Sequence, residues 1–451
     1  MFNATICNNT MCNNTMCNKM CSRISVGMMV WSAILTTILF VPATPAAAQQ
    51  ERVLHSFNYN GHDGYNPDAG LVIDAMGNLY GTTFNGGAGS CVNGNGAVIG
   101  CGTAFELMPN SEGGYSEKIL HSFNYNGRDG YNPLAGLILD VAGNLYGTTL
   151  LGGSGTCSDG NGVVIGCGAV FELTPAANGC WSEQILHSFH NNGTDGVGPY
   201  SGVVFDAAGN LYGTTIGGGI YAYGTVYELT PRTGGGWRQM ILHNFEDADG
   251  QEPRGGVILD GLGNLYGTTL HGGTFFNGVA FELSPQTDGP WTEIVLHSFG
   301  GSGDGFIPDS GPIFDQAGNL DGTTDLGGAF GLGGTAFELT PAAGGSWTET
   351  VMYSFGNGTD GCCPLAGLTL DASGNLYGTT LGGGTAGFGT AFELTAAGGG
   401  VWNETQLHSF GEGEDGSVPD GGLIFDTSGN LYGTTDSGGT YGYGTVFEIV
   451  P

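Results

Sequence analysis

Histidine recurs in this sequence at a spacing that could place imidazoles for metal chemistry. Six of the nine histidines share one position of a Leu-His-Ser-Phe-like segment, and a tyrosine takes it once: His55, His121, His187, His243, His297, His408 and Tyr353. A ring of imidazoles could bind a metal. The alternative is that each one hydrogen-bonds a neighbouring strand or turn. We expect the structural role, because strands at the rim of the fold would hold these side chains far apart.

Aspartate recurs in a D-G-x-x-P-x-x-G segment that occurs seven times: Asp63, Asp129, Asp195, Asp249, Asp304, Asp360 and Asp415. A carboxylate needed by every copy is more often a turn fastener than a site. Two segments are richer in carboxylates, one with Asp247, Asp249 and Glu252, the other with Glu412, Glu414 and Asp415. Clustered oxygen ligands of this kind suit Ca²⁺, although the spacing is not that of an EF-hand loop. The first segment is our candidate Ca²⁺ site, and Ca²⁺ is the only candidate cofactor.

Aromatic residues crowd several glycine-rich connections and form the candidate ligand-binding set: Tyr221, Tyr223, Phe275, Phe276, Phe388, Tyr441 and Tyr443. Aromatic rings among Asp and Asn could stack on sugars while polar groups hold the hydroxyls. The alternative, which the sequence favours, is that they fill gaps between neighbouring sheets.

Cysteines at equal spacing predict two local disulfides, Cys91–Cys101 and Cys157–Cys167, in matched extensions of the first two repeats. Zinc is the alternative, but no nearby His or Cys completes a tetrahedral set. Cys180 has no matching partner, and the adjacent Cys362 and Cys363 either form a vicinal bridge or stay reduced.

No nucleophile elbow, P-loop, zinc-protease helix or kinase motif set is present, and no catalytic residue is assigned. A carboxylate pair at a central opening could still support glycoside or lyase chemistry, which the sequence cannot place. Active sites tend to break the symmetry of a repeat. The departures here are Asp321, Tyr353, Cys362, Cys363, His62, Arg128, His190 and His271, and none forms a convincing set.

The segment Gly-Asn-Leu-Tyr-Gly-Thr-Thr sets the period that must position these residues. It begins at Gly77, Gly143, Gly209, Gly263, Gly318, Gly374 and Gly429, with Asp321 replacing one Tyr. A period of this size is typical of propellers and solenoids. Each copy reads as four short strands, for example 257–260, 265–269, 279–283 and 291–299, and the Asp that heads each D-x-x-G-N turn is expected to cap it.

The ends of the chain predict a closed ring. Residues 53–57 look like a lone fourth strand, and residues 447–449 like a third strand with no fourth after it. The first strand can therefore complete the last blade and remove two exposed edges. We expect an all-β, seven-bladed propeller of four-stranded antiparallel blades, with ligands on the face that carries the long connections after the second and fourth strands.

The charge balance limits the partners. The chain has 41 acidic and 8 basic residues and a formal net charge of -33. Such a surface repels nucleic acid and anionic lipid and tolerates cations, neutral sugars or basic partners. We expect no nucleic-acid binding.

The first 48 residues read as a signal peptide. Lys19 and Arg23 precede an apolar run at 26–41 and a small-residue stretch that ends near Ala48. Met20 would make a more usual start. We expect a secreted protein with one propeller domain at 49–451, no carboxy-terminal anchor and no stable membrane insertion.

The full pattern, D-G-x-x-P-x-x-G-L-x-x-D-x-x-G-N-L-Y-G-T-T followed by G-T-x-F-E-L-T-P and L-H-S-F, resembles the GloVer tandem repeat of secreted bacterial proteins over about residues 51–451. Its first half is also similar to the strand pair of NHL-type propellers. The resemblance implies export and often a sorting anchor, which we do not expect here, and it transfers no functional residue.

The function that the sequence favours is non-catalytic recognition of carbohydrate or another extracellular partner through the long-loop face, by a monomer. The alternatives are a propeller hydrolase or lyase acting on polysaccharide, and a purely structural surface protein.

Overall fold

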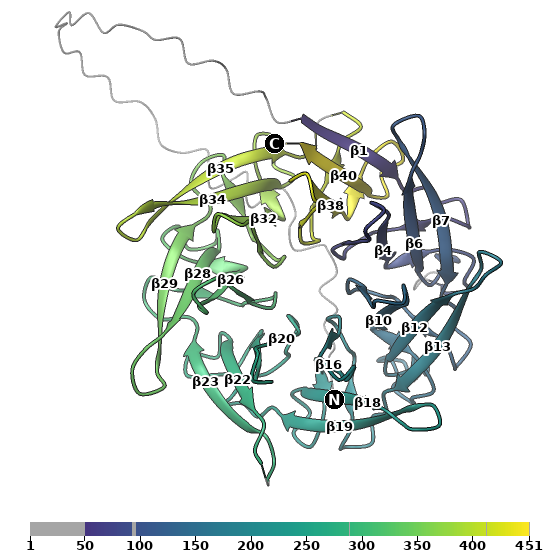
Figure 1. Cartoon of the computed structure of the whole chain (residues 1–451), viewed down its shortest axis with the longest axis horizontal. Helices are drawn as coiled ribbons and strands as arrows, with labels where there is room; N and C mark the ends of the chain where they lie inside the picture. Colours follow the sequence, from purple (N-terminus) through teal and green to yellow (C-terminus); the bar gives the residue numbers. More distant parts are fainter. Residues whose placement is uncertain (1–49, 93–95, 288, 412, 451) are drawn as a thin grey trace, which may run out of the picture.

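The computed structural model describes residues 50–92, 96–287, 289–411 and 413–450. The predicted signal peptide and Glu412 lie outside these residues. The described chain is all-β and forms seven four-stranded antiparallel sheets arranged around a common axis (Figure 1). The predicted seven-bladed propeller is confirmed.

The blades have the same strand order from the axis to the rim. The first three are β3 (Val72–Ile73), β4 (Leu79–Thr83), β6 (Thr103–Pro109) and β7 (Tyr115–Ser122); β9 (Ile138–Leu139), β10 (Leu145–Thr149), β12 (Ala169–Pro175) and β13 (Trp181–Ser188); and β15 (Val204–Phe205), β16 (Leu211–Thr215), β18 (Thr225–Pro231) and β19 (Trp237–Asn244). The next two are β20 (Val257–Leu259), β21 (Leu265–Thr269), β22 (Val279–Ser284) and β23 (Thr292–Ser298); and β25 (Ile313–Phe314), β26 (Leu320–Thr324), β28 (Thr335–Pro341) and β29 (Trp347–Ser354). The last two are β31 (Thr369–Leu370), β32 (Leu376–Thr380), β34 (Thr390–Gly398) and β35 (Val401–Ser409); and β37 (Ile424–Phe425), β38 (Leu431–Thr435), β40 (Thr445–Val450) and β1 (Gln50–Ser56).

The ring closes through β1, as the sequence predicts. β1 pairs antiparallel with β40 in the last blade, with a bulge between Val53 and His55. Arg52 Nη2 also lies 2.6 Å from Glu448 Oε2 across this pair. The strand that starts the described chain therefore covers the edge that its end would leave exposed.

Short two-stranded ribbons join the two long connections of a repeat by antiparallel pairing. The sequence did not predict them. They are β2 (Gly64–Tyr65) with β5 (Asn85–Gly86), β8 (Gly130–Tyr131) with β11 (Leu151–Gly152), β14 (Gly196–Val197) with β17 (Gly217–Gly218), β24 (Gly305–Phe306) with β27 (Leu326–Gly327), β30 (Gly361–Cys362) with β33 (Gly382–Gly383), and β36 (Gly416–Ser417) with β39 (Ser437–Gly438). In the fourth blade a bridge between Gln251 and His271 takes this place. The pairing puts both long connections on one face, which we call the long-loop face.

The recurring Gly-Asn-Leu-Tyr-Gly-Thr-Thr segment is structural. In the first copy the Asp74 carboxylate caps the turn by accepting the Met76 and Asn78 N–H groups at 2.8 and 2.9 Å, as predicted. The Tyr80 hydroxyl bridges Asp74 and Glu106. Thr82 Oγ1 donates to the Ala135 carbonyl of the next blade at 3.0 Å. The segment therefore ties each blade to itself and to its neighbour.

Glycines that close each D-G-x-x-P-x-x-G segment meet around the axis. A Cβ on Gly136 would lie 3.0 Å from the Gly70 carbonyl, and one on Gly70 would lie 3.4 Å from the Gly422 carbonyl. The same approach continues from Gly422 to Gly367 and from Gly367 to Gly311. The Pro-x-x-Gly part of each segment is thus the innermost part of its repeat.

Candidate functional site

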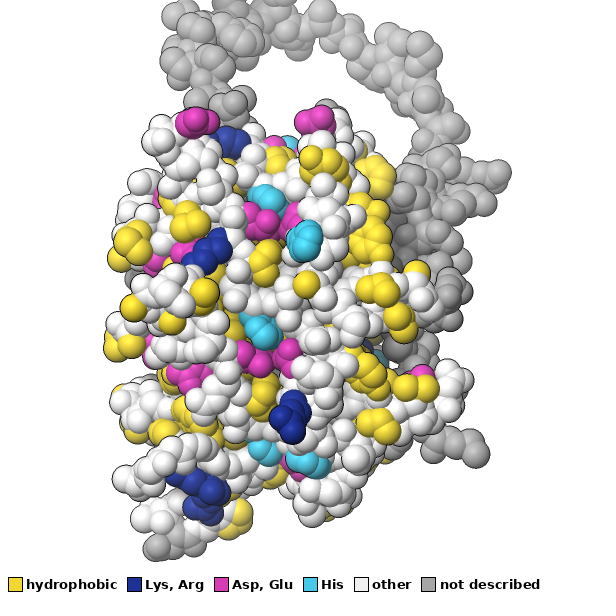
Figure 2. Space-filling view, turned by 90° about the vertical axis from the view of Figure 1, so that its right-hand side faces the viewer, with side chains coloured by type: hydrophobic (Ala, Val, Ile, Leu, Met, Phe, Trp, Pro, Cys, Tyr) yellow, Lys and Arg dark blue, Asp and Glu magenta, His cyan; other side chains and the backbone are white. Residues whose placement is uncertain are grey.

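The recurring histidines and aspartates meet in pairs. In six repeats a His Nε2 lies 2.8–3.6 Å from an Asp Oδ2: His55–Asp63, His121–Asp129, His187–Asp195, His243–Asp249, His297–Asp304 and His408–Asp415. In the remaining repeat the Tyr353 hydroxyl donates to Asp360 Oδ2 at 2.9 Å. Each imidazole contacts the turn that follows its own strand, which agrees with the predicted structural role. Figure 2, which views the rim, shows histidine and carboxylate side chains side by side.

A third carboxyl group, which sequence reasoning missed, joins each pair from the outer strand of the next blade. It comes from Glu117, Glu183, Glu293, Glu349, Glu404 or Glu51, and Gln239 replaces it once. In four of these groups the His, Asp and Glu ligand atoms lie within 4.8 Å of one another. A signal was available for five of the six glutamates: the Glu follows an aromatic residue by two positions, as in Trp181-Ser182-Glu183, whereas Glu51 follows Gln49. We call each of the seven groups an inter-blade clasp, including the one in which Gln239 replaces the Glu and the one in which Tyr353 replaces the His.

The pKa values of the clasp glutamates are raised. Burial, and then the charge of Asp63, raise the pKa of Glu117 to about 9. Burial and Asp129 do the same for Glu183. Burial and Asp249 raise the pKa of Glu293 to about 8. The values for Glu51, Glu349 and Glu404 rise to about 7, with burial as the first cause.

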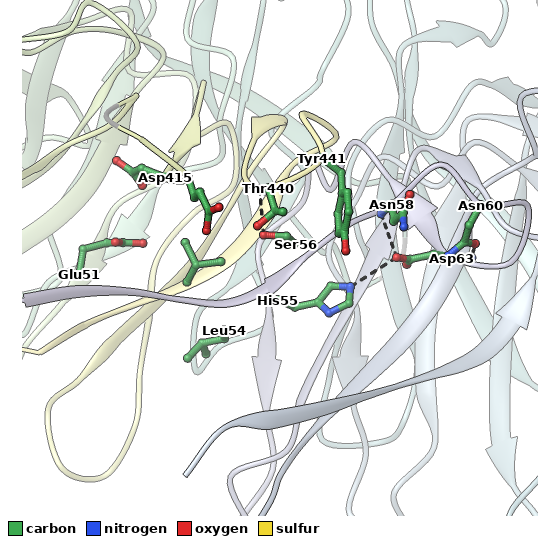
Figure 3. Close-up of a pocket in the computed structure, with 12 residues that line it drawn as sticks. Glu51, Leu54, His55, Ser56, Asn58, Asn60, Asp63, Asp415, Thr440 and Tyr441 are labelled. Carbon is green, nitrogen blue, oxygen red and sulfur yellow. Dashed lines mark hydrogen bonds and ion pairs between the residues drawn. The ribbon is translucent and has the colours of Figure 1, made fainter. Parts of the chain in front are cut away.

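A pocket of about 790 Å³ opens at the seam where β1 closes the ring. Residues from β1, from the segments around 58–63 and 414–415, and from Thr440 and Tyr441 line it. Figure 3 shows Ser56, Thr440 and Tyr441 in the middle of the lining, between Glu51 and Asp415 on one side and Asn58, Asn60 and Asp63 on the other. We call it the seam pocket. It combines one exposed aromatic ring with amides, hydroxyls and carboxylates.

The positions that ring the axis on the long-loop face do not follow the sevenfold pattern. We call them the hub residues: the residue after each recurring Pro, which is Asp68, Leu134, Tyr200, Arg254, Asp309, Leu365 or Asp420, and the residue after each Gly-Thr-Thr, which is Phe84, Leu150, Ile216, Leu270, Asp325, Leu381 or Asp436. Five carboxylates come from the first, fifth and seventh repeats. The second and sixth repeats contribute only leucines at these positions.

Backbone geometry fixes the hub residues. The residue before each recurring Pro adopts a left-handed conformation, with φ of 63° at Ile307 and 62° at Val418. Its carbonyl accepts the N–H of the residue after Gly-Thr-Thr, for example Asp325 N–H to Ile307 O and Asp436 N–H to Val418 O, both at 2.9 Å. Six of these seven residues are not glycine, so the backbone is strained at a ring of positions next to the hub.

The hub carboxylates act on one another. Burial, and then the charges of Asp309, Asp436 and Asp325, raise the pKa of Asp420 to about 7. Burial and Asp309 raise the pKa of Asp325 to about 6. Burial is also the first cause of the raised pKa of Asp68, followed by the charge of Asp436 and a hydrogen bond between the two carboxyl groups. Burial and mutual repulsion therefore make Asp68, Asp325 and Asp420 weaker acids than exposed carboxyl groups.

Arg254 is the hub's cation. Its guanidinium lies 3.5 Å from Asp309 Oδ1 and 3.3 Å from Glu252 Oε2, and 5.0 Å from the centre of the Tyr200 ring. Its Nε is buried and has no hydrogen-bond partner. Two of the predicted symmetry departures also reach the hub. Cys363 hydrogen-bonds Asp325, and the charge of His271 acts on Asp309.

The predicted ligand-binding aromatics lie in the second-to-third connections of four blades. Tyr221, Phe275, Phe276 and Tyr441 are about half exposed or more, and Tyr223 and Phe388 are 39% and 36% exposed. Tyr443 instead packs on Tyr59 and Tyr65, with ring centres 5.8 and 5.4 Å away. Tyr441 also lines the seam pocket. A ligand role for these residues stays a prediction.

The candidate Ca²⁺ residues have separate partners. Asp249 belongs to a clasp with His243, Asp247 accepts from Gln251, and Glu252 pairs with Arg254 at the hub. Four groups in the described part of the chain bring three His or carboxylate ligand atoms within 4.8 Å, and none of them includes these three residues. The Ca²⁺ site stays a prediction.

Both predicted disulfides, Cys91–Cys101 and Cys157–Cys167, are confirmed. Cys180 is an exposed free thiol. Among the residues that the structure describes, no helix is long and apolar enough to cross a membrane.

A family model described as Gloeobacter/Verrucomicrobia repeat matches residues 154–371 and 334–451 of the chain. No curated protein matches it. Similar solved structures include a putative 6-phosphogluconolactonase from Bacteroides uniformis, at 14% identity and a TM-score of 0.45, covering 76% of this chain and 87% of that one. An ancestral GH74 enzyme has 11% identity and a TM-score of 0.47 over 82% of this chain and 53% of its own. PorZ, a surface component of the type-IX secretion system of Porphyromonas gingivalis, has 14% identity and a TM-score of 0.48 over 86% and 47%.

Proposed function

The chain belongs to the Gloeobacter/Verrucomicrobia repeat family, and we propose that it is an exported, non-catalytic carbohydrate-recognition module that binds its ligand at the hub of the long-loop face. The observation that carries the proposal is the loss of sevenfold symmetry at the hub. Motifs that build the blades recur in nearly every copy, whereas the hub changes from carboxylates and one arginine to leucine, isoleucine and phenylalanine. A ligand-binding site needs particular side chains, so we expect it at positions that do not follow the repeat.

The chemistry of the hub suits a sugar. Carboxylate oxygens accept hydrogen bonds from hydroxyl groups, and Arg254 donates them. Tyr200 and the aliphatic hub residues offer apolar surface to the C–H faces of a pyranose ring. The exposed Tyr441 of the seam pocket gives a longer glycan a second contact on the same face.

Glycan-array binding and calorimetry with the best glycan test this function. The variant Asp309→Asn/Asp420→Asn keeps the size of both side chains but lowers their strength as hydroxyl acceptors. We expect about a tenfold loss of affinity or more, since hydrogen bonds to charged groups contribute about 1.5–3 kcal/mol each. Glu112→Gln, at an exposed turn between β6 and β7, is the matched control and should bind like the wild type. The absence of binding to any glycan, or equal affinity of the double variant, would contradict the proposal.

A polysaccharide hydrolase or lyase is the second candidate, and the hydrogen bond between the Asp68 and Asp436 carboxyl groups favours it. Two carboxyl groups that share a proton can supply an acid and a base. Release of soluble sugar from plant or bacterial polysaccharides, lost in Asp68→Asn, would support the enzyme. Binding without product would exclude it for the glycans tested.

A further inference from the structure

The inter-blade clasps contain more acceptors than donors if every carboxyl group is ionised. One oxygen of each clasp glutamate is buried and has no hydrogen-bond partner: Glu51, Glu117, Glu183, Glu293, Glu349 and Glu404 Oε1. The facing Oδ1 atoms of Asp63, Asp129 and Asp304 are in the same state. In four clasps the Asp and Glu oxygen atoms lie within 4.8 Å of each other. Two ionised carboxylates this close repel each other, and each loses its hydration on burial. A proton or a cation must therefore lie between them.

The chain itself contains a substitution that separates these two possibilities. In the third repeat Gln239 stands where the other repeats have Glu, and its Nε2 donates to Asp195 Oδ1 at 2.7 Å. The amide N–H lies where the O–H of a protonated glutamate would lie, and it donates the same hydrogen bond to the aspartate. The amide is, however, a poor metal ligand. Gln239 thus shows what the glutamate does when it carries a proton.

A second substitution points the same way. Tyr353 replaces the histidine of the sixth clasp, and its hydroxyl donates to Asp360 Oδ2 at 2.9 Å. In all seven clasps the aspartate is unchanged, while each of its two partners is replaced only by another neutral donor. A His with two carboxylates would suit a divalent metal, but the repeats with Gln or Tyr would lose a ligand and still keep the same geometry.

We propose that the clasp glutamates are neutral carboxylic acids that donate a hydrogen bond to the aspartate of the preceding repeat, so that protons fasten each blade to the next. Six protons, with Gln239 as the seventh fastener, then connect the outer strands of the ring, including the closing strand β1 through Glu51. As the pH rises these protons dissociate, the paired carboxylates repel each other, and the rim loosens.

The groups that face each glutamate agree with this assignment. Glu117 faces Asp63 and His55, Glu183 faces Asp129 and His121, and Glu349 faces Asp304 and His297. Glu51 faces Asp415 and His408, Glu293 faces Asp249, and Glu404 faces Asp360. The nearby bases Lys118 and Arg52 pair with Glu106 and Glu448 instead. After burial, an aspartate is therefore the main cause of the raised pKa at each of the six glutamates, and an imidazole opposes it at Glu51 and Glu349.

The sign of the pH dependence follows from linkage. The pKa of each glutamate is raised from 4.5 to between about 7 and about 9 in the folded state. Between these values the folded protein holds protons that the unfolded chain has released. Stability contributed by the clasps is therefore complete below pH 4.5 and falls as the pH rises towards 9.

Urea unfolding at pH 5, 7 and 9 tests the proposal with two reciprocal variants. The sixfold variant E51Q/E117Q/E183Q/E293Q/E349Q/E404Q carries at every clasp the residue that the third repeat already uses. We expect it to match the wild type at pH 5 and to unfold at a higher urea concentration than the wild type at pH 9. Histidines and hub carboxylates are common to both proteins, so the difference isolates the clasps. The pair E117Q/E183Q tests the two most strongly shifted groups if the sixfold variant does not fold.

The single variant Q239E is the reverse test. It should leave the urea midpoint unchanged at pH 5 and lower it at pH 9. An equal loss at both pH values, or a sixfold variant that falls between pH 5 and 9 as steeply as the wild type, would overturn the proposal. A separate experiment tests whether a metal ion holds the clasps together. Addition of EDTA should not shift the wild-type midpoint and Zn²⁺ should not raise it, whereas a chelator-dependent loss of stability would show that a cation holds the clasps.

Discussion

The role of a repeat position in this propeller can be inferred from the copy in which a different residue takes that position. Asp321 is the clearest case. The other six repeats have a tyrosine that bridges or approaches two carboxylates, whereas Asp321 is 3% exposed and has an oxygen without a partner. Burial, and then Glu338 and Asp315, raise the pKa of Asp321 to about 7. A third carboxyl group takes the place of the donor that the site needs.

Asp321→Tyr should stabilise the protein. The hydroxyl would donate to Glu338 or Asp315, and the ring would fill the space that the equivalent Tyr266 occupies between two blades. We expect a gain of about 1–3 kcal/mol at pH 8, since a buried group without a partner costs about this much. The gain should shrink towards pH 5, because a raised folded-state pKa makes Asp321 costly only above its unfolded value. Urea unfolding measures both values. Tyr266→Asp, the reciprocal change, should destabilise the protein, and a stabilising effect there would contradict this explanation.

At the scale of elements, two of the second-to-third connections carry extra length that a disulfide closes. Cys91–Cys101 and Cys157–Cys167 join the ends of matched extensions, and both Cys101 and Cys167 are buried against their blades. Equal spacing in the sequence was sufficient to predict these bonds, because a loop of this size brings its ends together whatever the rest of the fold does.

Cys91→Ser/Cys101→Ser should destabilise the folded protein by about 2–3 kcal/mol, the chain-entropy estimate for a short loop. The effect should be local, so that limited proteolysis cleaves within residues 92–100 while the seven blades stay intact. Cys180→Ser is the control and should change neither property, since its thiol is exposed and free. Global unfolding at the same protease concentration would show that the bond supports more than its own loop.

At the scale of the whole molecule, closure joins residues from the two ends of the described chain. β1 supplies the outer strand of the last blade, and Thr434 Oγ1 donates to the Ala69 carbonyl of the first repeat at 2.8 Å. Glu51 of β1 also completes the clasp with His408 and Asp415. The last blade thus depends on the first residues of the described chain for its sheet, its axis contact and its rim contact.

Deletion of residues 50–57 should therefore be far more damaging than its length suggests. It uncovers β40 as an edge strand and removes Phe57, which is fully buried. We expect aggregation or association through β40, measured by light scattering, together with loss of a single cooperative melting transition. Deletion of the exposed turn residues 111–113 is the control and should leave a monomer with a cooperative transition. A monomeric, cooperatively folded product from the first deletion would contradict the role assigned to β1.

Much of this architecture follows from the sequence by itself: the number of blades, the four strands of each, the closing strand, the turn-capping aspartates and the two disulfides. Each depends on residues close together in one repeat, or on a count of repeats, and so on periodicity that the chain displays directly. Tertiary structure decided the rest. The glutamate of each clasp, the two-stranded ribbons and the acidic hub bring together residues from different strands or different blades. Their proximity depends on the rotation between neighbouring sheets and on the distance of each residue from the axis, and neither quantity is expressed in a local pattern. The recurring His and Asp could be interpreted as structural from their repeat positions, but the third carboxyl group that joins them from the next blade is found only in the folded ring.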